Sequence, residues 1–141
     1  MRYRILAVGR VKDGGVRSAC DVYLKRLQHY AQVDEKEVKD EARILGSIPQ
    51  DSRLVALSRV GEAWTSRMLA ERTAGWEMEG RDVGFAIGGA ETLPAAVLGR
   101  ADCTWSLSAL TLPHELARLI VLEQLYRAHT IRRGEPYHRG P

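Results

Sequence analysis

The chain has 141 residues, of which 45% are hydrophobic and 28% charged, and its formal net charge is +3. Length and composition predict one globular domain spanning residues 1–141. The longest apolar stretch, residues 116–125, is interrupted by Arg118 and Glu123, so we expect no membrane-spanning helix. The first residues lack the apolar core and cleavage site of a signal peptide, and we therefore expect a cytoplasmic protein.

Apolar runs and helical periodicity alternate along the chain. Short apolar runs predict buried strands at residues 3–8, 53–58, 83–87 and 103–106. A weak alternation predicts an edge strand at residues 33–39. Apolar residues spaced by three and four predict helices at residues 16–30, 66–76, 93–99 and 115–130, and residues 41–45 form at most one helical turn. This alternation predicts an α/β fold with a mostly parallel sheet flanked by helices.

Local signals predict where several of these elements begin. The pair Gly14-Gly15 indicates a turn before the first helix. Thr65 is placed to cap the second helix. Pro94 and Pro113 fall near the first positions of the last two helices, where a missing N–H group is tolerated.

The two cysteines, Cys20 and Cys103, are far apart and belong to no CxxC pair. Their spacing does not match a zinc site, so we expect no metal. A disulfide is not expected in a cytoplasmic protein. We interpret both residues as core thiols.

Two strand ends are followed by loops that suit a ligand pocket. Gly88-Gly89 follows one buried strand, and the uncharged stretch 106–111 follows another. Carboxyl ends of parallel strands meet at one edge of a sheet, which is where α/β proteins bind ligands. The glycines suit either close approach to a ligand or a tight turn. The stretch 106–111 suits either an adenine ring or a connection whose hydroxyls cap the next helix.

Charged and aromatic residues near the end of the chain form a second candidate site. Glu123 and Arg127 are four residues apart on the last expected helix. They form either a surface ion pair or part of a functional site. Tyr137 and His138 stand where chain ends usually fray, so they are either incidental or ordered for a function. Basic residues gather at both ends of the chain, and they predict either a phosphate-binding face or a solvated surface.

Four motifs in this order closely resemble the RlmH family, and the resemblance covers nearly the whole chain. The family consists of small SPOUT-class enzymes that methylate N3 of a pseudouridine in large-subunit (23S) ribosomal RNA. The motifs are Ile87-Gly88-Gly89, residues 105–114 (WSLSALTLPH), residues 123–128 (EQLYRA) and residues 136–139 (PYHR).

The resemblance implies a cofactor, an assembly and a set of site residues. It implies S-adenosylmethionine as methyl donor, large-subunit ribosomal RNA as partner, and a trefoil knot in the C-terminal part of the sheet. It implies a homodimer whose active site uses both subunits, with the C-terminal tail ordered against the partner. The implied cofactor contacts are Leu57, Gly88, Leu107, Ser108, Ala109, Leu110, Thr111 and Leu112, and the implied catalytic residues are Glu123, Arg127, Tyr137 and His138.

These residues suggest a mechanism. His138 would take the N3 proton directly or through water, while Arg127, oriented by Glu123, would stabilise the developing negative charge or hold a phosphate. The chain departs from the family pattern at Thr92, where members commonly have glycine, and at Ser58, where many have an acidic residue. The alternative functions are a sensor that binds S-adenosylmethionine or a nucleotide without catalysis, and a dimeric ribosome-associated module with no cofactor.

Overall fold

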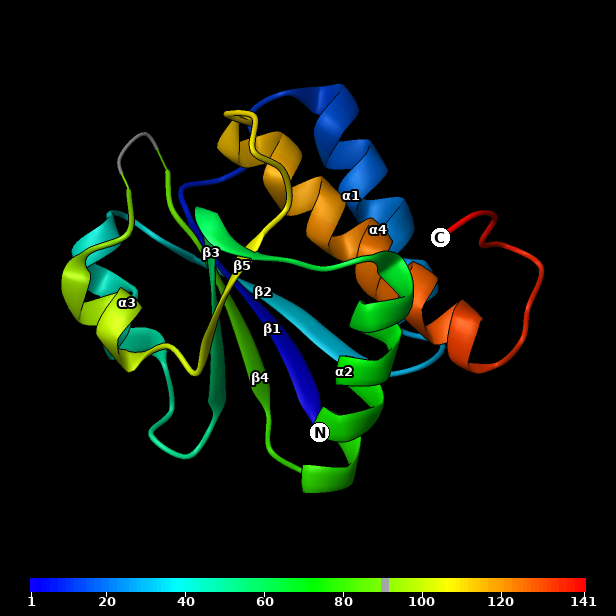
Figure 1. Ribbon diagram of the computed structural model, residues 1–141. Coiled ribbons are helices and arrows are strands. Elements are labelled where there is room, and N and C mark those ends of the chain that lie inside the picture. The colour runs from blue at the N-terminus through cyan, green and yellow to red at the C-terminus, as the bar shows by residue number, and fades with distance from the viewer. Residues whose placement is uncertain (90–91) are drawn as a thin grey trace.

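The computed structural model describes residues 1–89 and 92–141, and Figure 1 shows how their elements are arranged. Strands and α-helices alternate along this part of the chain, with two short 3₁₀ turns after the second strand. In order they are β1 (Arg2–Val8), α1 (Gly14–Leu27), β2 (Gln32–Val38), η1 (Glu41–Arg43), η2 (Leu45–Ser47), β3 (Arg53–Ala63), α2 (Ser66–Glu79), β4 (Val83–Ile87), α3 (Ala95–Arg100), β5 (Cys103–Ser106) and α4 (His114–Arg132).

The five strands form one sheet in the order β2-β1-β4-β3-β5, and every neighbouring pair is parallel. The central strand β4 is buried along all five residues, as expected for a strand covered on both faces. Phe85 of β4 is in register with Ile5 of β1 and Val55 of β3. The predicted α/β fold is confirmed, and so is the edge position of β2.

Helices cover both faces of the sheet. Figure 1 shows α1, α4 and α2 on one face and α3 on the other. Because successive strand residues point to opposite faces, Tyr3 and Phe85 pack against the three-helix layer, while Leu6 and Ala86 pack against Ile44 and the α3 side. The layer of three helices forms the larger core, in which α4 contacts both α1 and α2.

Three helix starts differ in detail from the sequence prediction. The pair Gly14-Gly15 is not a turn but the first residues of α1, because the side chain of Asp13 accepts a hydrogen bond from the backbone N–H of Val16 (2.9 Å) and caps the helix. Pro94 and Pro113 occupy the N-cap positions of α3 and α4. The predicted cap of α2 at Thr65 is confirmed.

β3 extends five residues beyond the predicted strand end. Leu57 and Glu62 are both in register with Trp105 of β5, so residues 58–61 bulge out between two stretches of regular pairing. The extension is polar and leaves the core, and its strand conformation depends on pairing with β5. Local sequence carries little information about such non-local pairing.

The first half of α4 is fixed to the sheet by a buried arginine. The Arg118 side chain is 3% exposed, and it donates to the carboxylates of Glu35 (2.5 Å) and Glu37 (2.6 Å) on β2. Its third contact is the carbonyl oxygen of Gly9 (3.3 Å). Charge-assisted bonds from one guanidinium thus join α4 to β2 and to the end of β1.

The two cysteines differ in burial. Cys20 is fully buried, as predicted, whereas Cys103 is half-buried on the edge strand β5 and packs against the core. Within residues 1–89 and 92–141, no helix is long and apolar enough to cross a membrane. Over the same residues, no three His, Cys, Asp or Glu side chains lie together as a metal site requires.

Candidate functional site

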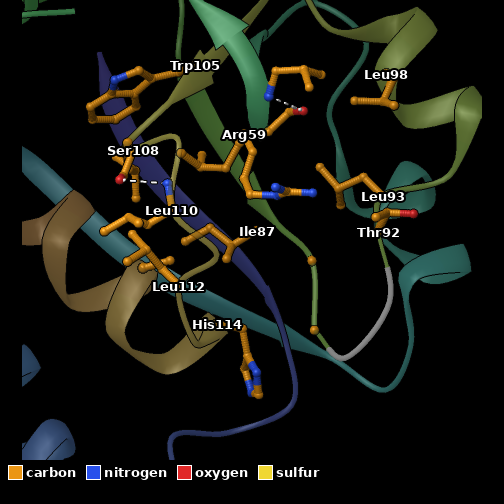
Figure 2. A pocket seen from close by; sticks show the side chains of 17 residues that line it. Arg59, Ile87, Thr92, Leu93, Leu98, Trp105, Ser108, Leu110, Leu112 and His114 are labelled. Carbon is orange, nitrogen blue, oxygen red and sulfur yellow. Dashed lines mark hydrogen bonds between the residues drawn. The ribbon is translucent and has the colours of Figure 1, made fainter. Parts of the chain in front are cut away.

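A cavity of about 310 Å³ lies at the carboxyl ends of β3, β4 and β5. Its volume is at the lower end of the range for small-molecule sites. Figure 2 shows side chains from the β3 bulge, the end of β4 and the loop after β5 facing into it. It is lined by Leu57, Ser58, Arg59, Val60, Ile87, Gly88, Gly89, Thr92, Leu93, Leu98, Trp105, Leu107, Ser108, Leu110, Leu112, His114 and Ala117.

Most of the residues expected to contact the cofactor line this cavity. Apolar side chains form its walls, and small residues form the edge next to β4. This composition suits a flat heteroaromatic ring with a polar extension. Ala109 and Thr111 are expected contacts that do not line it; those that do are Leu57, Gly88, Leu107, Ser108, Leu110 and Leu112.

Serine hydroxyls shape the loop between β5 and α4. Ser106 donates through Oγ to the carbonyl oxygen of Ser108 (3.1 Å), and the Ser108 Oγ accepts from the backbone N–H of Leu110 (3.0 Å). No side chain caps α4. Helix capping, one of the two interpretations of this stretch, is therefore not what these hydroxyls do. They hold a turn that carries Leu107, Leu110 and Leu112 to the cavity.

Residues that sequence reasoning did not assign also line the cavity. The family-pattern departures Ser58 and Thr92 both face it, as does Arg59 between Ser58 and Val60. The only signal for this segment was the change from an apolar run to the polar Ser58-Arg59 followed by Gly61. That change predicts the end of a strand and does not reveal the bulge.

The four residues expected to be catalytic lie together at the other end of α4. Arg127 donates to the Glu123 carboxylate (2.8 Å) and contacts the Nδ1 atom of His138 (3.1 Å). The Tyr137 hydroxyl donates to the same carboxylate (2.6 Å), and the Arg127 guanidinium lies over the Tyr137 ring. The Glu123–Arg127 pair on α4 thus makes the contacts that hold Tyr137 and His138 of the tail.

The contact with Arg127 fixes the proton positions on His138. A guanidinium only donates hydrogen bonds, so Nδ1 must accept, and a neutral imidazole in this arrangement carries its proton on Nε2. Nε2 is buried and has no hydrogen-bond partner among the described residues. Unsatisfied polar atoms of this kind are rare and often mark functional sites.

Tyr137 and Glu123 are joined in a network of hydrogen bonds. Burial is the largest cause that raises the pKa of Tyr137, and hydrogen bonds to Glu123 and Tyr23 raise it further. The Tyr137 hydroxyl therefore keeps its proton and remains a hydrogen-bond donor. The carboxylate of Glu123 also accepts from Gln124, so four N–H or O–H groups point at its two oxygens. Its lone pairs are used in positioning these neighbours.

The aromatic surroundings of this cluster were not predicted. Tyr126 packs edge-on against Tyr137, with 4.7 Å between ring centroids, and the Tyr23 hydroxyl lies 3.5 Å from that of Tyr137. In the sequence Tyr23 is one member of the apolar stripe of α1, which indicates core packing and no more. Only the meeting of α1, α4 and the tail reveals its place in the cluster.

The tail is ordered by contacts with its own chain. The backbone N–H of Glu135 donates to the carbonyl oxygen of Thr130, and the Glu135 carboxylate accepts from the Tyr30 hydroxyl (2.7 Å). With the Arg127 and Glu123 contacts, this fixes residues 135–138 on α1 and α4. Ordering of the tail against a partner subunit, which the resemblance implies, stays a prediction beside these contacts within the chain.

Several basic residues at the chain ends are neutralised by carboxylates. Arg2 and Arg4 pair with Asp34, and Arg17 pairs with Glu35. Near the other end, Arg132 pairs with a glutamate of α2. The phosphate-binding face that composition suggested is therefore weaker than the number of basic residues indicates.

The cavity and the four-residue cluster lie apart within one chain. None of the four is among the described residues that line the cavity. Ala117 is the last α4 residue at the cavity, and Arg127 follows ten positions later, about 15 Å along the axis and a quarter turn around it. The chain therefore presents two separate candidate sites, the cavity and the cluster, on different faces of α4.

Comparison with known proteins assigns the family. The model of the family described as "Predicted SPOUT methyltransferase" matches residues 1–138. A protein of Anaeromyxobacter sp. named Ribosomal RNA large subunit methyltransferase H is 44% identical, over 99% of this chain and 100% of that protein. The chain belongs to the RlmH family of SPOUT methyltransferases. A second RlmH protein, from Polynucleobacter asymbioticus, is 41% identical over 99% of both chains.

Solved structures share the fold of this chain. A methylase family protein from Haemophilus influenzae Rd KW20 aligns with 98% of this chain and 70% of its own, with a TM-score of 0.63 and 12% identity. A methyltransferase from Legionella pneumophila, solved with its cofactor SAM bound, aligns with 91% of this chain and 66% of its own, with a TM-score of 0.51 and 10% identity. At these identities the likeness concerns the fold alone.

Proposed function

We propose that this protein uses S-adenosylmethionine to methylate N3 of a pseudouridine in large-subunit (23S) ribosomal RNA. One observation carries the proposal: an apolar cavity at the strand ends accompanies a preassembled Glu123–Arg127–Tyr137–His138 cluster. Relatives named as large-subunit ribosomal RNA methyltransferases match the chain over its whole length, which supports the substrate class. Action on ribosomal RNA would place the protein in the cytoplasm.

The cavity has the character that S-adenosylmethionine requires. Leu107, Leu110 and Leu112 supply walls for the adenine ring, and Gly88 leaves room for close approach of the ligand to the backbone at the end of β4. When bound there, the cofactor would supply an activated methyl group. The loop after β5 and the end of β4 face the same cavity, which is consistent with a chain threaded there as a trefoil knot.

The separation of the cavity from the four-residue cluster supports a homodimer. Methyl transfer needs the reacting atoms about 3–3.5 Å apart. Ala117 at the cavity and Arg127 in the cluster are ten residues apart on α4, about 15 Å along the axis, which supports a site where the cluster of a second copy meets the cavity of the first. Apolar residues at the cavity mouth suit such a partner: Val60 is 92% exposed and Leu110 is 71% exposed.

The cluster is arranged to stabilise negative charge on the target base. Loss of the N3 proton places that charge on the two neighbouring carbonyl oxygens of the ring. His138, held in orientation by Arg127, would donate through its Nε2–H group to one of these oxygens once the base displaces the groups that bury this atom in the free chain. Because Nδ1 is already occupied and the Glu123 oxygens are saturated, we assign the N3 proton to solvent water and not to either side chain.

The proposal is tested by methyl transfer to ribosomes that lack the modification. Labelled S-adenosylmethionine is incubated with naked 23S RNA, isolated large subunits or assembled ribosomes, and the nucleosides are identified by mass spectrometry. We expect 3-methylpseudouridine in at least one substrate. Cofactor binding by calorimetry without transfer to any of them would indicate a sensor, and absence of binding would indicate a module that works without a cofactor.

A further inference from the structure

The β3 bulge places an arginine at the cavity. Leu57 and Glu62 both stand opposite Trp105, so the chain between them leaves the sheet and carries Arg59 outward. Close backbone contact fixes the bulge: a Cβ atom on Gly61 would lie 2.7 Å from the carbonyl carbon of Thr104. The position of Arg59 therefore follows from strand pairing on both sides of it.

The Arg59 side chain lines the cavity and is also exposed to solvent. In Figure 2 its guanidinium extends between Ile87 and the Thr92–Leu93 segment. No hydrogen bond or ion pair joins Arg59 to another residue in the described part of the chain, unlike Arg53 and Arg72, which both pair with glutamates. Among the lining residues that the structure describes, Arg59 is the only Arg or Lys, and none is Asp or Glu.

The one formal charge among the described lining residues is that of Arg59, and a guanidinium favours a ligand that brings an anion. S-Adenosylmethionine carries a positive sulfonium, a positive ammonium and one carboxylate. Arg59 would repel the first two, whereas a guanidinium matches a carboxylate in a bidentate, charge-assisted pair. A phosphate of the RNA offers the same anionic chemistry, and because Arg59 is exposed to solvent, the test must separate the two sources of the anion.

We infer that Arg59 binds the α-carboxylate of the cofactor, an inference that rests on the proposed function. Arg59, on the β3 bulge, would then bind the cofactor together with the residues of the loop between β5 and α4. The ligand's amino-acid end then lies toward Thr92, and its adenine ring lies toward the leucines that follow β5.

Calorimetry with two ligands tests this inference. S-Adenosylmethionine carries the carboxylate, whereas 5′-methylthioadenosine keeps the adenosine and the sulfur but lacks the amino-acid end. Arg59→Gln should weaken S-adenosylmethionine binding about 10–100-fold and leave 5′-methylthioadenosine binding unchanged. Arg59→Lys should lose less affinity, because lysine keeps the positive charge but cannot form the two parallel hydrogen bonds that a guanidinium makes with a carboxylate. Arg67→Gln, an exposed arginine of α2 away from the cavity, is the matched control.

Other outcomes overturn the inference in distinguishable ways. Unchanged S-adenosylmethionine binding by Arg59→Gln overturns it, and if RNA binding then weakens with a smaller salt dependence, the anion is a phosphate. Equal losses of affinity for S-adenosylmethionine and 5′-methylthioadenosine would show that Arg59 maintains the shape of the cavity and does not bind the carboxylate. If the wild-type protein binds neither ligand, the proposed function itself fails and the inference falls with it.

Discussion

Replacing His138 with alanine is expected to lower kcat for methyl transfer about 10²–10³-fold, the cost of removing one donor to a developing oxyanion. The cofactor dissociation constant should stay unchanged, because His138 does not line the cavity. Single-turnover transfer to the preferred RNA substrate measures the first quantity, and calorimetry measures the second. Wild-type turnover in this variant would remove His138 from the mechanism.

A glutamine variant separates the two possible roles of His138. The side-chain amide of Gln can donate an N–H group but cannot act as a base, so His138→Gln should recover part of the activity that His138→Ala loses. The pH dependence of kcat should have the same form in wild type and His138→Gln if the imidazole only donates. If His138 is a base, the wild-type profile shows an ionisation between about pH 5 and 8 that the glutamine variant lacks.

Arg118→Met is expected to produce the largest loss of stability, about 3–5 kcal/mol in the free energy of unfolding. The variant removes a buried cation and leaves Glu35 and Glu37 without it. Glu35 keeps its pair with Arg17, whereas Glu37 keeps none in the described part of the chain. Urea unfolding followed by circular dichroism measures the change.

A double variant is the control for the Arg118 prediction. Arg118→Met combined with Glu37→Gln also removes one of the stranded charges, so it should recover part of the lost stability. Because α4 residues His114 and Ala117 border the cavity, the single variant should also bind S-adenosylmethionine more weakly. A stability loss below about 1 kcal/mol would show that the network contributes no more than a surface ion pair.

The parallel sheet could be predicted because its strands are buried on both faces. A strand such as Val83–Ile87 is apolar along its whole length, and that pattern is visible without any knowledge of its neighbours. The second half of β3 could not be predicted in this way. Its polar residues are held in strand conformation by pairing with β5, an interaction between segments about forty residues apart.

The candidate site was predictable to different extents in its two halves. Glu123 and Arg127 stand four residues apart on one helix, so their pairing follows from helical geometry. Family resemblance singled out Tyr137 and His138, but the contact that sets the His138 tautomer depends on how the tail returns to α4. Arg59 gave no sequence signal, because its direction depends on the bulge and on the close approach of Gly61 to β5.

We propose that one active site combines the cavity of one protomer with the cluster of another. Two inactive variants test it when they are co-expressed with different tags and isolated as a heterodimer. One is His138→Ala, and the other is Leu112→Arg, which fills the cavity with a long cation and must first be shown to lose cofactor binding. The heterodimer then contains one intact site, and we predict about half of the wild-type activity per dimer. A heterodimer as inactive as its two parents would contradict the shared site.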